Sequence, residues 1–277
     1  MAEELLRALR ERIREETALI VAFSGGVDSA LVATVASQEL GPRAVAVTAV
    51  SPSLSPTART QAREFAGRYG IRHVEVCTDE IERPEYVRNQ GDRCYHCKSA
   101  LLDAVEPIAS LAGGRIALGT NTDDLGDHRP GQRAAAARGV ISPLVDVGMS
   151  KGDVRRVSAD LGLSTAAKPA SACLASRVAY GDPVTAEVLE RIDRAESVLQ
   201  SLGFAECRVR AHANGTVARI EVPEEDIERV VVARDLLDRE LRATGFAFAA
   251  IDLAGFRSGR MNVLLGMPGR PPTRPAG

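Results

Sequence analysis

The chain has 277 residues, which predicts about two domains and enough buried surface to hold a core without disulfide or metal staples. Its net charge of −2 and pI near 6.2 argue against a strongly basic nucleic-acid-binding protein. The chain has neither an apolar stretch of the ~20 residues that span a bilayer nor the apolar core of a signal peptide. We therefore expect a cytoplasmic protein without membrane contact, whose five cysteines stay reduced.

The first strong signal in chain order is the run SGGVDS at residues 24–29. The apolar residues 18–23 before it predict a buried strand, and residues 30–36 after it predict a helix. A glycine pair at such a junction lets the backbone approach a ligand closely, and the helix start offers N–H groups to an anion. The two serine hydroxyls and the Asp28 carboxylate favour a phosphate site over an ordinary capped helix start. The run is not a Walker A loop, because no lysine follows its second glycine.

Strands and helices alternate through the first two thirds of the chain. Further strands are predicted at 43–50, 72–78 and 115–119, helices at 56–69, 95–111 and 150–161, and an irregular segment at 79–92. This alternation predicts an α/β fold with a parallel sheet flanked by helices, in which ligands bind beyond the carboxyl ends of the strands.

The segment that follows residues 115–119 is either a plain turn or part of the nucleotide site. In the functional interpretation, Gly119 lies against the nucleotide and Asp124 or Asp127 lies near magnesium or the substrate. The polar residues 129–131 are expected to hold substrate or to meet a neighbouring subunit.

Residues 164–184 have little periodicity, and a loop of that length is typically functional or mobile. Helices at 185–202 and 224–244 and strands at 207–211, 216–222 and 246–253 are predicted after it. We therefore expect two domains, residues 1–182 and a smaller α+β domain at 183–267, followed by a disordered tail at 268–277.

The cysteines indicate metal or sulfur chemistry. Cys94 and Cys97 form a CxxC pair at a predicted helix start, which suits half a zinc site, a redox pair or part of an iron–sulfur site. Cys173, in the long loop, favours the last, because three thiolates can hold three irons of a 4Fe-4S cluster and leave the fourth iron open. A zinc site would need a fourth ligand, for which His96 is the near candidate. The two other cysteines lie in predicted strands and are expected in the core: Cys77 and Cys207.

The predicted second domain carries two groups of arginines. Arg208 and Arg210 share one face of a strand, and Arg257 and Arg260 lie in a glycine-rich turn. Each group by itself is compatible with a solvated surface, but together they would suit a phosphomonoester.

These motifs together resemble the LarE family of ATP-dependent sulfur transferases, whose PP-loop carries the SGGxDS signature. The likeness covers nearly the whole chain and includes the CYHC pair at 94–97, ACLASR at 172–177, RVR at 208–210 and GFRSGRMN at 255–262. The resemblance implies a PP-loop (adenine nucleotide alpha hydrolase-like) fold and a homo-oligomer, with hexamers known in the family. The implied reaction converts pyridinium-3,5-biscarboxylic acid mononucleotide to its bisthiocarboxylic acid in nickel-pincer nucleotide biosynthesis.

The resemblance also implies AMP-forming chemistry, in which ATP with Mg²⁺ adenylates a substrate carboxylate before sulfur displaces AMP. One branch of the family sacrifices a single cysteine, which matches Cys173, while the other binds a 4Fe-4S cluster through three cysteines. Because Cys94, Cys97 and Cys173 are all present, the chain resembles the cluster branch. The source of sulfide stays open.

The site residues implied by the resemblance fall into three groups. The ATP-binding group comprises Ala22, Ser24, Gly25, Gly26, Asp28, Ser29 and Gly119, with Asp28 also catalytic beside the three cysteines. The substrate-binding group comprises Ser176, Arg177, Arg208, Arg210, Arg257 and Arg260. A weaker implication is a metal site at Glu196 and Glu221.

Three alternatives remain. A PP-loop tRNA thiolase also uses a CxxC pair and a distant third cysteine, but the acidic pI and the lack of a recognisable RNA-binding domain argue against it. An ATP-dependent amidotransferase or NAD synthetase-like ligase would carry structural zinc. A nucleotide-binding regulator would bind AMP without catalysis.

Overall fold

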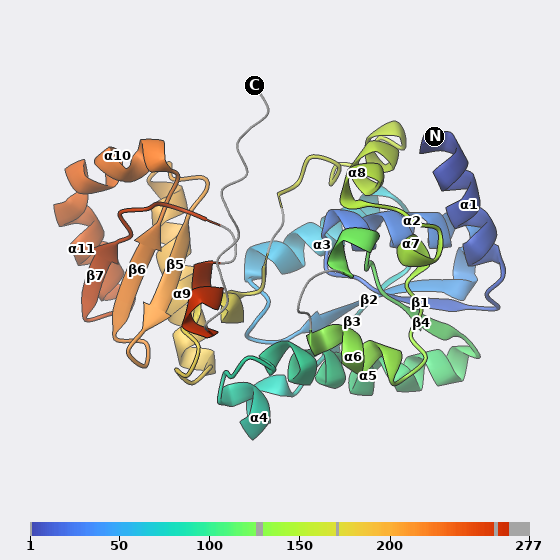
Figure 1. Ribbon diagram of the computed structural model, residues 1–277, viewed down its shortest axis with the longest axis horizontal. Coiled ribbons are helices and arrows are strands. Elements are labelled where there is room, and N and C mark those ends of the chain that lie inside the picture. The colour runs from blue at the N-terminus through green and yellow to red at the C-terminus, as the bar shows by residue number, and fades with distance from the viewer. Residues whose placement is uncertain (1, 126–129, 170–171, 258–259, 266–277) are drawn as a thin grey trace. The chain divides into compact units, whose positions relative to one another are not determined.

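The computed structural model describes residues 2–125, 130–169, 172–257 and 260–265. The chain divides into two compact units (Figure 1). The first unit is Met1–Glu80 with Cys94–Ala172, and the second is Ile81–Arg93 with Cys173–Gly277. The tail expected at 268–277 lies outside the described residues.

The first unit is built on four parallel strands in the order β3-β2-β1-β4. The strands are β1 (Leu19–Ala22), β2 (Ala44–Val50), β3 (His73–Cys77) and β4 (Arg115–Ala117). The first three residues of β1 are buried and Ala22 is partly buried, as expected for a central strand with helices on both faces. The predicted parallel α/β sheet is therefore confirmed, and the carboxyl ends of its strands lie at one edge.

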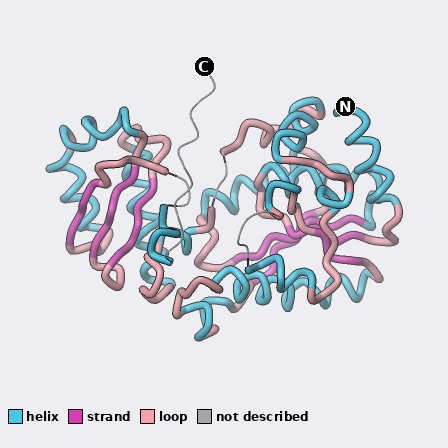
Figure 2. Tube along the Cα trace, in the orientation of Figure 1, coloured by secondary structure: helices cyan, strands magenta, loops and turns pink. Residues whose placement is uncertain are grey.

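Helices cover both faces of this sheet (Figures 1 and 2). One face carries α1 (Ala2–Arg14), α2 (Val27–Leu40), α3 (Pro56–Arg68), α7 (Pro143–Asp146) and α8 (Lys151–Asp160). The other carries α5 (Arg93–Ala112) and α6 (Pro130–Ala136). The alternation along β1 explains both layers: Leu19 and Val21 belong to the core with α1 and α2, while Ile20 packs with Leu102 and Val105 of α5.

The second unit contains a three-stranded sheet in the order β5-β6-β7. Its strands are β5 (Arg208–His212), β6 (Val217–Glu221) and β7 (Phe248–Ile251), and β6 is antiparallel to β5 but parallel to β7. The helices are α4 (Pro84–Val87), α9 (Ala186–Ser201), α10 (Ile227–Val232) and α11 (Arg234–Ala243).

The prediction of a single helix at 224–244 is wrong. The chain forms a 3-10 turn at Glu224–Asp226 and then α10 and α11, separated at Ala233, whose ψ of 9° leaves the helical range. The β-branched run at 230–232 before the break forms helix weakly, because its side chains lose rotamer freedom there.

Residues 81–93 join the second unit through Asn89, which is fully buried. The Asn89 amide donates to the carbonyl oxygens of Ala179 at 2.7 Å and Asp182 at 2.9 Å. Its side-chain oxygen accepts from Arg93, whose guanidinium lies 5.5 Å from the ring centroid of Tyr180. These bonds join residues 81–92, which belong to the segment predicted to be irregular, to the residues around Ala179 and Asp182 of the same unit.

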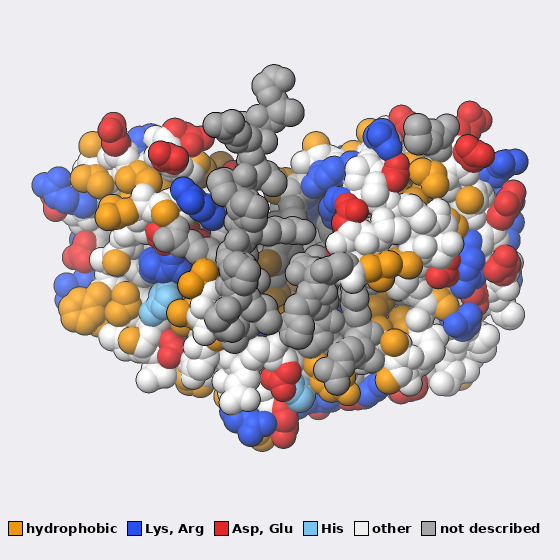
Figure 3. Space-filling view, viewed as in Figure 1, with side chains coloured by type: hydrophobic (Ala, Val, Ile, Leu, Met, Phe, Trp, Pro, Cys, Tyr) orange, Lys and Arg blue, Asp and Glu red, His pale blue; other side chains and the backbone are white. Residues whose placement is uncertain are grey.

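The surface agrees with the balanced composition. On the face shown in Figure 3, positively and negatively charged side chains intermix over each unit. No helix within the described ranges is long and apolar enough to cross a membrane.

Candidate active site

The loop at residues 24–29 joins the end of β1 to the start of α2. Gly25 has a φ of +70°, which side chains rarely tolerate, so glycine suits this turn. The Ser24 and Ser29 hydroxyl oxygens lie 3.1 Å apart, and the Ser29 hydroxyl donates to the Gly26 carbonyl at 3.2 Å. The N-cap residue of α2 is Gly26, and no side chain of the described residues caps the helix there, so the N–H groups of its first turn can bind an anion.

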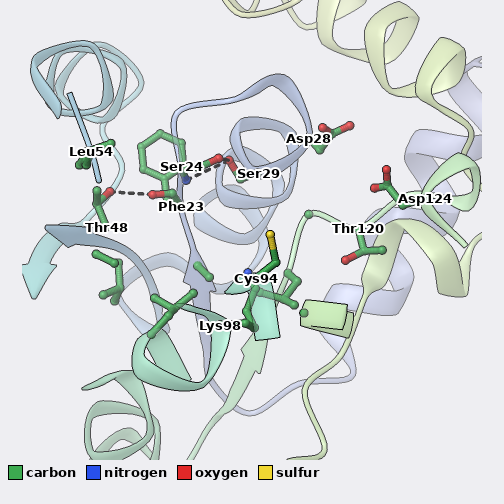
Figure 4. A pocket seen from close by; sticks show the side chains of 17 residues that line it. Phe23, Ser24, Asp28, Ser29, Thr48, Leu54, Cys94, Lys98, Thr120 and Asp124 are labelled. Atoms are coloured by element: carbon green, nitrogen blue, oxygen red, sulfur yellow. Dashed lines mark hydrogen bonds between the residues drawn. The ribbon is translucent and has the colours of Figure 1, made fainter. Parts of the chain in front are cut away.

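A cavity of about 570 Å³ opens beside this loop, at the carboxyl ends of β1, β2 and β4 (Figure 4). Its lining comprises Ala22, Phe23, Ser24, Asp28, Ser29, Val47, Thr48, Ala49, Leu54, Cys94, Lys98, Leu101, Leu118, Gly119, Thr120, Asp124 and Gly131. That volume and the mixture of apolar walls with a few polar groups are typical of a small-molecule site. The cavity lies where the predicted sheet places a ligand.

Asp28 points to the same side of the cavity as Asp124 (Figure 4). Its carboxylate forms an ion pair with Lys151 and accepts from the Asn121 amide at 3.1 Å. The Asp124 carboxylate accepts from the Asn121 backbone N–H at 3.1 Å. Carboxylate oxygens arranged in this way suit a hard cation such as Mg²⁺. Asp127, the alternative to Asp124, lies outside the described residues.

Gly119 lines the cavity and also packs against the start of α2. A Cβ atom at this position would lie 2.6 Å from the backbone nitrogen of Ser29, too close for any side chain. Glycine is therefore required for strand and helix to approach each other. Of the segment 129–131, Gly131 lies in the cavity wall, while Arg129 falls outside the described residues.

Cys94 brings a thiol into the cavity wall. Its side chain, in the first turn of α5, points into the cavity on the side where Ser24 and Ser29 lie (Figure 4). Lys98 lines the same wall; burial lowers the pKa of its ammonium group, while the charges of Cys97 and Cys94 oppose that shift.

The remaining cysteines differ in exposure. Cys97 is half-buried and Cys173 is exposed, in the second unit. Cys207 is buried, as predicted, and burial raises its thiol pKa to about 12. The core position predicted for Cys77 is wrong, because β3 is an edge strand and the side chain is exposed. Within the described ranges, no three His, Cys, Asp or Glu side chains gather to hold a metal ion.

Arg177 and Ser176 surround the backbone of Cys173. The Cys173 carbonyl accepts from the Ser176 hydroxyl at 2.7 Å and from Arg177 Nη1 at 3.0 Å. Arg177 is itself buried in an ion pair with Glu196, and Arg210 donates to the Ser176 carbonyl at 2.9 Å. The second unit thus brings these predicted residues together.

Glu221 is fully buried between two arginines. Its Oε2 atom lies 2.9 Å from Arg210, and its Oε1 atom lies 2.8 Å from Arg219. The carboxylates of Glu196 and Glu221 are both paired with arginines. The metal site suggested at these two residues stays a prediction.

The other predicted arginines are less enclosed. Arg208 lies 5.2 Å from the Phe256 ring centroid, and burial, followed by the charge of Arg177, lowers its pKa. Arg257 is exposed, whereas the side chain of Arg260 lies outside the described part of the chain.

The sequence did not predict two lysines that contact the loop at residues 24–29. Lys151 pairs with Asp28, and Lys168 Nζ donates to the Gly25 carbonyl at 2.9 Å. Both lie more than 100 residues from their partners, as the 123-residue separation of Lys151 from Asp28 illustrates. No local pattern marks them, since an isolated lysine in a polar stretch reads as a solvated side chain.

The sheet, the loop and the cavity define a PP-loop α/β domain of the kind that uses ATP. Residues 1–90, which contain β1, the loop at 24–29, α2, β2, α3 and β3, match the family model described as asparagine synthase. Over 260 residues the chain is 35% identical to the pyridinium-3,5-bisthiocarboxylic acid mononucleotide synthase of Lactiplantibacillus plantarum, covering 93% of this chain and 92% of that protein. The chain belongs to the LarE family, as its motifs predicted.

Two further relatives span nearly the same length. The uncharacterized protein slr1717 of Synechocystis sp. is 44% identical over 96% of this chain and 99% of its own. The uncharacterized protein MJ0830 of Methanocaldococcus jannaschii is 25% identical over 92% and 96%. Membership of this family makes the chain an ATP-dependent enzyme.

Proposed function

We propose that this chain is an AMP-forming sulfur transferase that converts the carboxylates of pyridinium-3,5-biscarboxylic acid mononucleotide to thiocarboxylates. The relative from Lactiplantibacillus plantarum carries the name of a synthase for that thiocarboxylate product. The observation that carries the proposal is the presence of the Cys94 thiol in the wall of the cavity that the phosphate loop borders. A thiol there brings sulfur chemistry next to the site of adenylation.

The first half of the proposed reaction makes the carboxylate reactive. A carboxylate resists substitution because its leaving group would be oxide, so its oxygen first attacks the ATP α-phosphate. The bond to the β-phosphate breaks, and pyrophosphate leaves at residues 24–29, where N–H groups and hydroxyls can stabilise its charge. Asp28 and Asp124 would hold Mg²⁺ beside it. A sulfur nucleophile then attacks the acyl carbon and AMP departs.

The second unit supplies groups suited to the substrate. Arg208, Arg210, Arg257 and Arg260 would bind the phosphomonoester of the mononucleotide, and Ser176 and Arg177 would orient the carboxylate. The bonds of Ser176 and Arg177 to the Cys173 carbonyl support this role, because they fix the cysteine backbone beside them.

The donor set is compatible with an iron–sulfur cluster. Cys94 and Cys97 lie one helical turn apart on α5; Cys94 and Cys173 are exposed, and Cys97 is half-buried. A 4Fe-4S cluster on three thiolates has one iron free to carry sulfide. Cys94, Cys97 and Cys173 would hold it in this proposal. Otherwise the Cys173 thiolate attacks the adenylate and AMP leaves; β-elimination then breaks the Cβ–Sγ bond, so that the sulfur stays on the product as a thiocarboxylate and residue 173 becomes dehydroalanine. We also propose that the protein assembles as a homo-oligomer in the cytoplasm.

The decisive experiment separates adenylation from sulfur transfer. Protein prepared anaerobically is assayed for iron and sulfide, and for pyrophosphate release with the biscarboxylic mononucleotide. Cys173→Ala is expected to abolish thiocarboxylate formation while pyrophosphate release continues. Loss of both activities in a folded variant would contradict the role of Cys173. Colourless protein that retains zinc would favour a ligase, and ATP-dependent thiolation of tRNA would favour a tRNA thiolase.

A further inference from the structure

A second, smaller cavity of about 280 Å³ adjoins the phosphate loop at Gly25. Its other walls come from α3 and from residues 164–168, which follow α8. All of these residues belong to the first unit, and Gly25 does not line the larger cavity described above. The second cavity is therefore a separate space that shares the loop with the nucleotide cavity.

Two cationic side chains line this space, the exposed Arg68 and the partly buried Lys168, and neither forms an ion pair with a carboxylate of the described residues. Lys168 Nζ donates one hydrogen bond to the Gly25 carbonyl, at 2.9 Å, which leaves two of its three N–H groups for a ligand. Burial lowers the pKa of Lys168. Among the described residues of the lining, Glu64 is the one carboxylate, so their charged side chains sum to +1.

Thr165 supplies a hydroxyl group that has no partner. The residue is 5% exposed, and its Oγ1 atom makes no hydrogen bond within the described structure. A buried hydroxyl without a partner costs free energy that a ligand oxygen would recover. Arg155 fixes the surrounding segment, because its guanidinium donates to the carbonyls of Ala166 at 2.7 Å and Lys168 at 2.9 Å. The backbone that carries Thr165 and Lys168 is thus held in place before any ligand arrives.

We infer that this cavity binds a small phosphate-class anion, namely the inorganic pyrophosphate that leaves the neighbouring loop. Ammonium, guanidinium and hydroxyl donors around a space with net positive charge suit such an anion. Gly25 of the loop lines this cavity, and Ser24, Asp28 and Ser29 line the nucleotide cavity, so pyrophosphate released at residues 24–29 leaves next to both spaces. The identity of the anion rests on the proposed adenylation, whereas the existence of the anion site rests on the cavity itself.

Calorimetric titration of the full-length protein with magnesium pyrophosphate tests the inference. Saturating α,β-methylene-ATP first fills the loop with phosphates that cannot be cleaved at the α–β bond. One equivalent of pyrophosphate is expected to bind in addition. Lys168→Met should weaken this binding about tenfold or more, since it removes a charged donor. Thr165→Val should weaken it severalfold and raise the Tm, because it removes the unsatisfied hydroxyl.

Ser158→Ala is the matched control. Ser158 is also buried with an unpartnered hydroxyl, but it lies on α8 outside the lining of the cavity. Its substitution should leave pyrophosphate affinity unchanged. Exclusion of pyrophosphate by the analogue, or unchanged affinity in both Lys168→Met and Thr165→Val, would overturn the inference.

The design keeps this inference separate from the proposed function. Titration of the analogue alone reports on the nucleotide cavity, so an analogue that does not bind counts against adenylation. In that case pyrophosphate is titrated without analogue into Lys168→Met, Thr165→Val and Ser158→Ala, and the loss of one binding step in the first two variants but not in the third still supports the second cavity.

Discussion

In each of the two units, a single carboxylate holds cations in fixed positions. Asp28 holds Lys151 at the start of α8, and Glu221 holds both Arg210 and Arg219. Glu221 is fully buried, and removing one member of a buried pair leaves the other charge uncompensated. These pairs therefore matter more than the many exposed ion pairs, which contribute little each.

The charge of Asp28 is the first test at this scale. Asp28→Asn keeps the shape of the side chain but removes the negative charge that would hold Mg²⁺. Pyrophosphate release is expected to fall about 100-fold or more, as for other preorganised electrostatic groups. Lys151→Met retains the carboxylate and should have a smaller effect. Unchanged AMP formation in Asp28→Asn would refute the assigned role.

The buried thiol of Cys207 gives a second test. Burial raises its pKa from 9.0 to about 12, so the folded protein keeps its proton at pH values where the unfolded chain releases it. Its contribution to stability is complete below pH 9 and declines as the pH rises toward 12. Denaturation of the unaltered protein and of Cys207→Ala measures this: the difference between their free energies of unfolding should change with pH between pH 9 and 12 and be constant below pH 9.

Thiol labelling at pH 8 provides the control for the same prediction. The exposed Cys77 and Cys173 should react with iodoacetamide in the folded protein, detected by peptide mass spectrometry, while Cys207 stays unmodified. Labelling of Cys207 at a similar rate would contradict its burial.

At the scale of elements, β3 shows how an edge strand is joined to the helix above it. Glu75 on β3 accepts from Arg59 at 2.6 Å and from Arg63 at 2.5 Å, and the two arginines lie one turn apart on α3. The charged pairs on this strand also discourage pairing with another sheet edge. The same edge position explains the exposure of Cys77.

Substitution of Glu75 should have a pH-dependent cost. Hydrogen bonds from Arg59, followed by those from Arg63, lower the pKa of Glu75 from 4.5 to about 2. The carboxylate therefore stabilises the fold above pH 4.5, and this contribution is lost as the pH falls toward 2. Glu75→Gln should cost about 1 kcal/mol at pH 7, because the pair is partly exposed. Urea denaturation at pH 7 and pH 2.5 checks this, and an equal cost at both would contradict it.

At the scale of the whole molecule, the two units are interleaved in sequence. Residues 81–93 separate the two segments of the first unit but belong to the second, where Asn89 bonds to the backbone of Ala179 and Asp182. The domain boundary after residue 182 stays a prediction. The contacts of the chain instead group Cys173 and the residues after it with 81–93.

Asn89→Ala is expected to loosen this connection. The substitution leaves buried carbonyl groups without a donor, at about 1–3 kcal/mol for each unsatisfied group. The backbone at Asn89 has a φ of +53°, a conformation in which alanine is strained. Hydrogen exchange should therefore increase in 81–93 and in 173–184 before it increases in β1 and β2. Uniform acceleration over both units would show that Asn89 acts on the whole fold. Asn89→Gly relieves the backbone strain without restoring the amide, and should recover only part of the loss.

Local sequence patterns determined the α/β fold, the phosphate loop and the family of this protein. The apolar run of β1, the two glycines and the following helix lie within a few residues of one another, so periodicity and turn chemistry suffice to predict them. The burial of Cys207 followed from the same reasoning and is confirmed.

Only the tertiary structure decided which distant residues meet. Lys151 reaches Asp28 and Lys168 reaches Gly25 because α8 and the segment after it pack beside the carboxyl end of β1. Cys77 is exposed because its strand lies at the sheet edge, a position set by strand order rather than by the residues of β3. Pairings over such separations depend on how whole elements share a core, and local periodicity carries no information about that arrangement.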